Sequence, residues 1–144
     1  MKKPRPGAPP RALRKRILVA EDEPGVREAL VLLLSLDGHS VTEASNGKEA
    51  LELFQAGRFD VVITDHAMPI MKGDELAANI NQLNPTQPII MISAHAQTLA
   101  DSGNPLTGIK IVLGKPFMLA DLREALANVL ADHDEAGAAP FLPN

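Results

Sequence analysis

The chain alternates five short apolar runs with longer segments of helical periodicity. The runs have the length and the β-branched content of strands. All but the second are almost continuously apolar, as expected for strands that helices cover on both faces. This alternation predicts an α/β fold, a doubly wound five-stranded parallel sheet with helices on both faces, whereas the strand order does not follow from the pattern. The expected strands are Ile17–Ala20, Ser40–Ala44, Val61–Thr64, Ile89–Ser93 and Ile109–Leu113.

Four of the segments that follow the predicted strands carry helix signals. The first begins with Pro24, which suits the first turn of a helix, and it ends at an Asp-Gly pair. The expected helices are Pro24–Leu36, Asn46–Ala56, Asp74–Leu83 and Met118–Leu130. The segment before the last strand differs, because Gly103, Asn104 and Pro105 stand where a helix would continue. We therefore expect a short or mobile fourth helix and a reshaped surface around Leu99–Leu113.

Length and composition exclude several classes of protein. The 144 residues fit one domain with tails. The chain has no cysteine, which excludes disulfides, thiolate zinc sites and cysteine nucleophiles. No apolar run approaches the roughly 20 residues of a membrane helix, and the N-terminus lacks the apolar core of a signal peptide. We expect a cytoplasmic protein that does not insert into membranes.

The charge is unevenly distributed along the chain. Residues 1–16 hold seven basic and no acidic residues, whereas the rest of the chain has a net charge of −11. The basic segment is rich in Pro, Gly and Ala and has no aromatic residue, so we expect a solubilising arm and no nucleic-acid partner. The predicted organisation is a disordered arm over residues 1–15, a folded domain over 16–131 and a flexible tail over 132–144.

Ionisable and polar side chains follow four of the five predicted strands. In open parallel sheets, function gathers at the carboxyl ends of the strands. Crowded carboxylates repel each other, and a hard divalent cation with oxygen ligands relieves the repulsion. We expect Mg²⁺; Ca²⁺ fits less well because no loop alternates acids and amides, and Zn²⁺ less well still because cysteine is absent. The side chains at this edge are Glu21, Asp22, Asp65, Ser93 and Lys115.

Three of these side chains together suit a phosphoryl group. The Lys115 ammonium is a point charge for phosphate oxygens, and the Ser93 hydroxyl can donate a hydrogen bond to one. Asp65 supplies the nucleophile that such a site needs, since carboxylates form acyl phosphates. Residues alone thus point to phosphoryl transfer onto Asp65.

Four motifs in this order resemble the receiver domain of two-component response regulators. They are ILVAEDEP, DVVITDHAMPIMKG, PIIMISA and KPF, and the resemblance runs from about Arg16 to Leu130. It implies a flavodoxin-like (βα)5 fold. It also implies that Asp65 accepts a phosphoryl group from a histidine kinase or a histidine phosphotransfer protein.

The resemblance further implies a role for each site residue. Mg²⁺ would be held by the carboxylates of Glu21, Asp22 and Asp65 and by the backbone carbonyl of Ala67. Ser93 and Lys115 would contact the oxygens of the transferred phosphoryl group. Pro69 and Gly73 would shape the loop after Asp65, with Gly73 adopting a backbone angle that other residues avoid.

Several neighbouring residues have simpler interpretations. We expect Glu23 to begin a helix, His66 to line the rim of the pocket, and Met68 and Met71 to be ordinary packing residues of the loop. The Ser93 hydroxyl could also cap the following helix. His66 is not needed as a base, since a carboxylate that is ionised at neutral pH attacks without one.

The chain departs from the family pattern at Val112. Receivers commonly carry Tyr or Phe three residues before the lysine, and rotation of that ring reports phosphorylation. This chain has Val112 there and no Tyr or Trp at all. We therefore expect any output signal to travel by loop rearrangement rather than by a ring flip.

The resulting functional prediction is a stand-alone phosphoacceptor. It would act by binding an unknown downstream protein or as a relay or sink, and it would not be an enzyme beyond self-catalysed phosphorylation and autodephosphorylation. One alternative is a Mg²⁺-dependent aspartyl phosphohydrolase, but such enzymes place a second Asp two residues after the first, where this chain has Ala67. Another is an unphosphorylated pseudo-receiver that binds partners. A nucleic-acid binder acting through the basic arm is a third.

Overall fold

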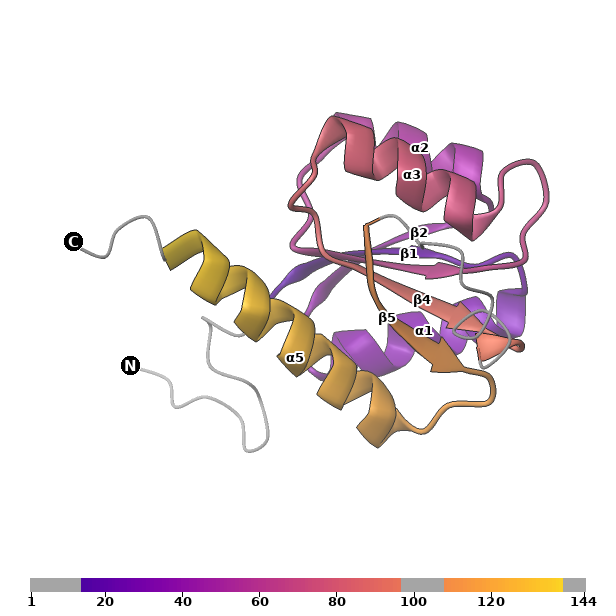
Figure 1. Ribbon diagram of the computed structural model, residues 1–144. Helices are drawn as coiled ribbons and strands as arrows, with labels where there is room; N and C mark the ends of the chain where they lie inside the picture. Colours follow the sequence, from indigo (N-terminus) through magenta and orange to yellow (C-terminus); the bar gives the residue numbers. More distant parts are fainter. Residues whose placement is uncertain (1–13, 97–107, 139–144) are drawn as a thin grey trace, which may run out of the picture.

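The computed structural model describes residues 14–96 and 108–138, which form one α/β domain (Figure 1). Strands and helices alternate along the chain, as the sequence pattern predicts. The elements are β1 (Arg16–Ala20), α1 (Pro24–Leu36), β2 (Ser40–Ala44), α2 (Gly47–Ala56), β3 (Val61–Asp65), α3 (Gly73–Leu83), β4 (Ile89–Ser93), β5 (Ile109–Gly114) and α5 (Leu119–Ala138).

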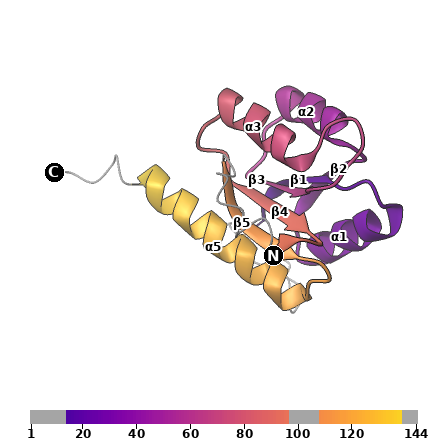
Figure 2. The ribbon, with the colours of Figure 1, turned by 45° about the vertical axis from the view of Figure 1, so that its right-hand side comes forward.

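The five strands form one parallel sheet in the order β2-β1-β3-β4-β5. Helices α1 and α5 cover one face of the sheet, and α2 and α3 cover the other (Figure 2). The winding direction reverses after β2, because the chain passes from this edge strand back across β1 to β3. The prediction of a doubly wound, flavodoxin-like α/β fold is confirmed.

Each face of the sheet has its own apolar core. Along β1, Ile17 and Val19 face α1 and α5, while Leu18 and Ala20 face α2 and α3. Because successive strand side chains point to opposite faces, a strand that is covered on both sides must be apolar throughout. This explains why β1, β3 and β4 read as continuous apolar runs.

The observed ends of the elements agree with the predicted ones to within a residue, with one exception. Helix α5 continues to Ala138, whereas the prediction ended it at Leu130 and began a flexible tail at residue 132. Residues 132–138, which the prediction assigned to the tail, are thus helical in the structure. These residues include Ala and Glu, which favour helix, and the first proline after them is Pro140. The helix therefore extends beyond Leu130, the last residue of the predicted helix.

The predicted arm also ends slightly earlier than expected. The Lys15 backbone N–H donates to His39 Nδ1 at 3.0 Å, and its carbonyl accepts from the Ser40 N–H at 2.9 Å. Lys15 is thus tied to the start of β2 and belongs to the folded domain. The rest of the predicted arm up to residue 13, the fourth helical segment at 97–107 and the tail from 139 lie outside the described residues.

Within residues 14–96 and 108–138, no helix is both long and apolar enough to cross a membrane.

Candidate functional site

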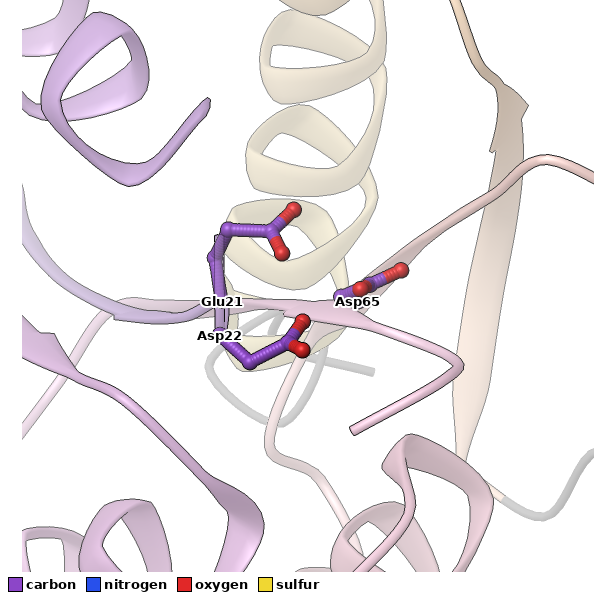
Figure 3. Close-up of side chains that lie close together, drawn as sticks. All are labelled: Glu21, Asp22 and Asp65. Atoms are coloured by element: carbon purple, nitrogen blue, oxygen red, sulfur yellow. The ribbon is translucent and has the colours of Figure 1, made fainter. Parts of the chain in front are cut away.

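Three carboxylates converge at the carboxyl edge of the sheet. Glu21 and Asp22 directly follow β1, and Asp65 is the last residue of β3. Strands β1 and β3 are neighbours, and Ala20 lies opposite Thr64, so the three acids come side by side. Figure 3 shows the carboxylates of Glu21 and Asp22 extending toward the side on which Asp65 lies, and one oxygen from each of the three acids lies within 4.8 Å of the others. Oxygen donors of this kind suit Mg²⁺.

Lys115 provides the positive charge of the cluster. Its Nζ lies 2.8 Å from Glu21 Oε1 and 3.3 Å from Asp65 Oδ1. Glu21 is fully buried and Asp65 is only 5% exposed, while Asp22 is half-buried at the opening. One ammonium therefore faces three carboxylates in a site largely shielded from water. Binding of a further positive charge would therefore reduce the repulsion among the carboxylates.

Burial and the neighbouring charges shift the pKa values of both Glu21 and Lys115. Burial raises the pKa of the Glu21 carboxyl to about 7, although hydrogen bonds from Lys115 and from the Glu23 N–H oppose the shift. Burial alone would lower the pKa of Lys115, but the adjacent carboxylates of Glu21 and Asp65 raise it above its usual value. The lysine is therefore charged at neutral pH, whereas Glu21 holds its proton more tightly than an exposed glutamate does.

The fourth and fifth strands supply the polar groups beside the acids. Ser93 ends β4 and is buried, and its carbonyl accepts from the Lys115 N–H at 2.9 Å, just beyond β5. The peptide bond between Lys115 and Pro116 is cis. The Ser93 Oγ accepts from the His95 N–H at 3.0 Å, while the helix that Ser93 could cap falls on residues outside the described ones. That bond uses an oxygen lone pair and leaves the hydroxyl proton available for a ligand.

The loop between β3 and α3 is held close to Asp65. The Gly73 N–H donates to the His66 carbonyl at 2.9 Å, which closes the loop. A Cβ on Gly73 would collide with the backbone oxygen of Asp65. Gly73 is therefore required by this close approach, and the prediction that it adopts an unusual backbone angle is wrong. The residue of this loop with a positive φ is Ile70, at 72°.

The response regulator receiver domain model matches residues 17–127. The chain belongs to this family. The match agrees with the extent of the sequence resemblance and covers all five strands apart from Arg16, the first residue of β1.

The receiver is similar to curated proteins of different lengths. It is 36% identical over 116 residues to the response regulator receiver protein CpdR of Brucella abortus, and the alignment covers 81% of this chain and 97% of CpdR. It is 36% identical over 107 residues to the response regulator MprA of Mycolicibacterium vanbaalenii, which spans 74% of this chain but only 46% of MprA. Against the probable transcriptional regulator ycf27 of Porphyridium aerugineum, 31% identity extends over 91% of this chain and 54% of the relative. The receiver thus spans about half the length of the latter two.

Solved receiver structures share the fold. TrrA of Thermotoga maritima, solved in complex with Mg²⁺-BeF, has a TM-score of 0.74 and 34% identity over 81% of this chain and 99% of that one. Chemotaxis response regulator CheY4 of Vibrio cholerae has a TM-score of 0.75 and 29% identity over the same shares of the two chains. The receiver domain of sensor histidine kinase PA1611 from Pseudomonas aeruginosa, with magnesium in its active-site cleft, has a TM-score of 0.75 and 27% identity over 82% and 98%.

The remaining predicted residues of this receiver occupy several different positions. Glu23 is the N-cap of α1, and Met68 and Met71 pack against α2 and α3, as expected. His66 is half-buried beside Asp65, and Ala67 is exposed two residues beyond it. Val112 lies in β5 opposite Met91 and is half-buried.

Sequence reasoning missed one residue of this site, Arg27. Its Nη1 donates to the Glu21 carbonyl at 2.8 Å, and its Nε donates to Glu43 Oε1 at 3.2 Å. The only sequence signal is a basic residue near the start of a helix, where acidic residues are favoured.

Proposed function

We propose that this receiver accepts a phosphoryl group on Asp65 from the phosphohistidine of a histidine kinase or histidine phosphotransfer protein. The observation that carries the proposal is the buried Asp65 carboxylate, which lies 3.3 Å from the Lys115 ammonium and beside two further acids. Because that donor acts in the cytoplasm, the proposal also places the protein there. Its downstream target would be a protein, with no nucleic-acid partner.

Transfer requires positioning and charge neutralisation more than covalent machinery. An Asp65 carboxylate oxygen attacks the phosphorus in line; the bond from phosphorus to the donor histidine nitrogen breaks, and the nitrogen keeps the electron pair. Lys115 pairs with one phosphoryl oxygen, and the Ser93 hydroxyl donates to another. Both residues stand at the ends of adjacent strands, so their backbones are fixed before the donor arrives.

The acids fit a Mg²⁺ ion by the chemistry of their donors. Glu21, Asp22 and Asp65 would hold it through carboxylate oxygens, and Ala67 would add its backbone carbonyl. When bound, Mg²⁺ supplies positive charge to the phosphoryl oxygens. The ion would also neutralise the negative charge of the buried Glu21 and Asp65 that Lys115 alone leaves unbalanced.

The test is phosphorylation by a small donor. With Mg²⁺ and acetyl phosphate, intact-protein mass spectrometry should detect the addition of one phosphoryl group that survives mild acid and is lost in alkali. Asp65→Asn should abolish the addition. Asp74→Asn is the matched control, because this aspartate is exposed on α3, and it should label like the wild type. Labelling that persists in Asp65→Asn would refute the assignment.

Failure of every donor, including a phosphohistidine protein, would favour an unphosphorylated pseudo-receiver. The phosphohydrolase alternative finds no acid at Ala67, two residues after Asp65. Rapid release of inorganic phosphate from small phosphomonoesters, lost in Asp65→Asn, would restore it.

A further inference from the structure

We infer that Arg27 is a positioning residue that holds the two acids Glu21 and Asp22 in the geometry required for Mg²⁺. This inference rests on the proposed function, since it concerns the same metal ligands. Arg27 lies on α1, and its side chain is only 18% exposed. It contacts the backbone of a metal-ligand residue rather than a carboxylate of the site.

The contact acts on the peptide plane that joins the two acids. Arg27 Nη1 donates to the Glu21 carbonyl oxygen at 2.8 Å. That oxygen and the Asp22 nitrogen belong to one planar peptide group. Fixing the oxygen therefore fixes the direction in which the Asp22 backbone leaves β1, and with it the position from which the Asp22 carboxylate reaches toward Asp65.

Glu21 has other anchors, whereas Asp22 depends on this plane. The Glu21 N–H donates to the Ala44 carbonyl at 3.0 Å, and its carboxylate accepts from Lys115 at 2.8 Å. Asp22 is half-buried and lies two residues beyond Ala20, the last paired residue of β1. Loss of the Arg27 contact should therefore displace Asp22 more than Glu21.

Local rules do not explain an arginine at this place. Arg27 is the fourth residue of α1, and the positive end of the helix dipole disfavours a cation near that terminus. Its second partner, Glu43 on β2, has a side chain that is more than half exposed, so this ion pair adds little stability. Glu43 instead holds the guanidinium from the other side, through Nε at 3.2 Å, and aims Nη1 at the carbonyl.

The inference is tested by the Mg²⁺ dissociation constant, measured calorimetrically at a fixed pH without a phosphodonor. Arg27→Lys keeps the charge but cannot contact the carbonyl and Glu43 with one planar group. We expect it to weaken Mg²⁺ binding by about tenfold, the lower end of the range for groups that orient metal ligands. Arg27→Gln should weaken it as well, and Glu43→Gln should weaken it less.

The direction in which the Mg²⁺ affinity changes distinguishes a positioning role of Arg27 from an effect of its charge alone. If Arg27 acted only through its charge, Arg27→Gln would bind Mg²⁺ more tightly and Arg27→Lys would bind like the wild type. The amide resonance of Asp22 should shift in Arg27→Lys before any Mg²⁺ is added. Arg123→Lys is the matched control: its arginine pairs with Asp37 at 2.7 Å between α5 and the end of α1, away from the site, and Mg²⁺ binding should not change.

Urea unfolding of each variant verifies that it is folded during titration. An unchanged Mg²⁺ dissociation constant in folded Arg27→Lys overturns the inference while acetyl phosphate labelling of Asp65 still supports the proposed function. Absence of both Mg²⁺ binding and labelling in the wild type overturns both.

Discussion

Burial of the Glu21 carboxyl in its charged form costs free energy of folding. Its carboxyl is fully buried, and its pKa is raised to about 7 by that burial. The unfolded chain releases this proton near pH 4.5. Between these values the unfolded state binds fewer protons than the native state, so the free energy of unfolding falls as pH rises. The contribution of Glu21 is fully present below pH 4.5 and is lost as pH passes 7.

We predict that Glu21→Gln removes this pH dependence in Mg²⁺-free buffer. The glutamine stays neutral, so its stability relative to the wild type should increase from pH 5 to pH 8, by at most about 3 kcal/mol. Urea unfolding at the two pH values measures the difference.

Asp37→Asn is the control for this experiment. The hydrogen bond from Arg123 lowers the pKa of Asp37 below its usual value of 3.8, so its contribution is lost only in acid. The stability difference for this variant should be equal at pH 5 and pH 8. An equal difference for Glu21→Gln as well would show that Glu21 titrates as an exposed carboxyl does.

At the scale of elements, the loop between β3 and α3 combines tight anchoring with local strain. Its ends are fixed by the Gly73 N–H bond to His66 and by the burial of Met68. Between them Ile70 has a φ of 72°, a region that is unfavourable for a β-branched residue. Its side chain is 74% exposed, so burial does not compensate for the strain.

We predict that Ile70→Asn stabilises the protein by about 1 kcal/mol, because asparagine adopts this backbone region at lower cost. Chemical denaturation measures the change. Leu83→Asn is the comparison: Leu83 is also exposed, but it ends α3, where asparagine brings no such relief. Equal effects of the two substitutions would mean that the backbone of Ile70 is not strained.

For the whole molecule, the proposed Mg²⁺ site would couple metal binding to folding. The three carboxylates that we propose as ligands come from two segments far apart in the sequence, which meet only in the folded sheet. A ligand that binds the native state alone stabilises it by an amount set by its concentration and dissociation constant, about 2.7 kcal/mol at 100 times that constant.

We predict that Mg²⁺ raises the melting temperature of the wild type by several degrees, and that EDTA reverses the increase. Asp22→Asn should abolish most of the increase, because it removes a ligand without adding a buried charge. Asp37→Asn serves again as the control and should respond to Mg²⁺ like the wild type. A full increase in Asp22→Asn would place the ion elsewhere.

The elements and the polar side chains at their ends could be predicted from the sequence alone. Strands covered on both faces must be apolar throughout, and helices need an apolar stripe with end signals, so both patterns are local and legible. The polar residues that follow the strands, among them Asp65 and Lys115, could be assigned to one edge because all strands of a parallel sheet end on the same side.

Which strands are neighbours and which groups are in contact depend on tertiary packing and could not be predicted from the sequence. The order β2-β1-β3-β4-β5 brings Glu21 beside Asp65, and no local pattern encodes that adjacency. The role of Gly73 follows from a close approach to the Asp65 backbone rather than from its own φ. The contact of Arg27 with the Glu21 carbonyl depends on how α1 packs against the sheet. Packing is non-local, and this is the physical reason why these contacts could not be derived from the sequence.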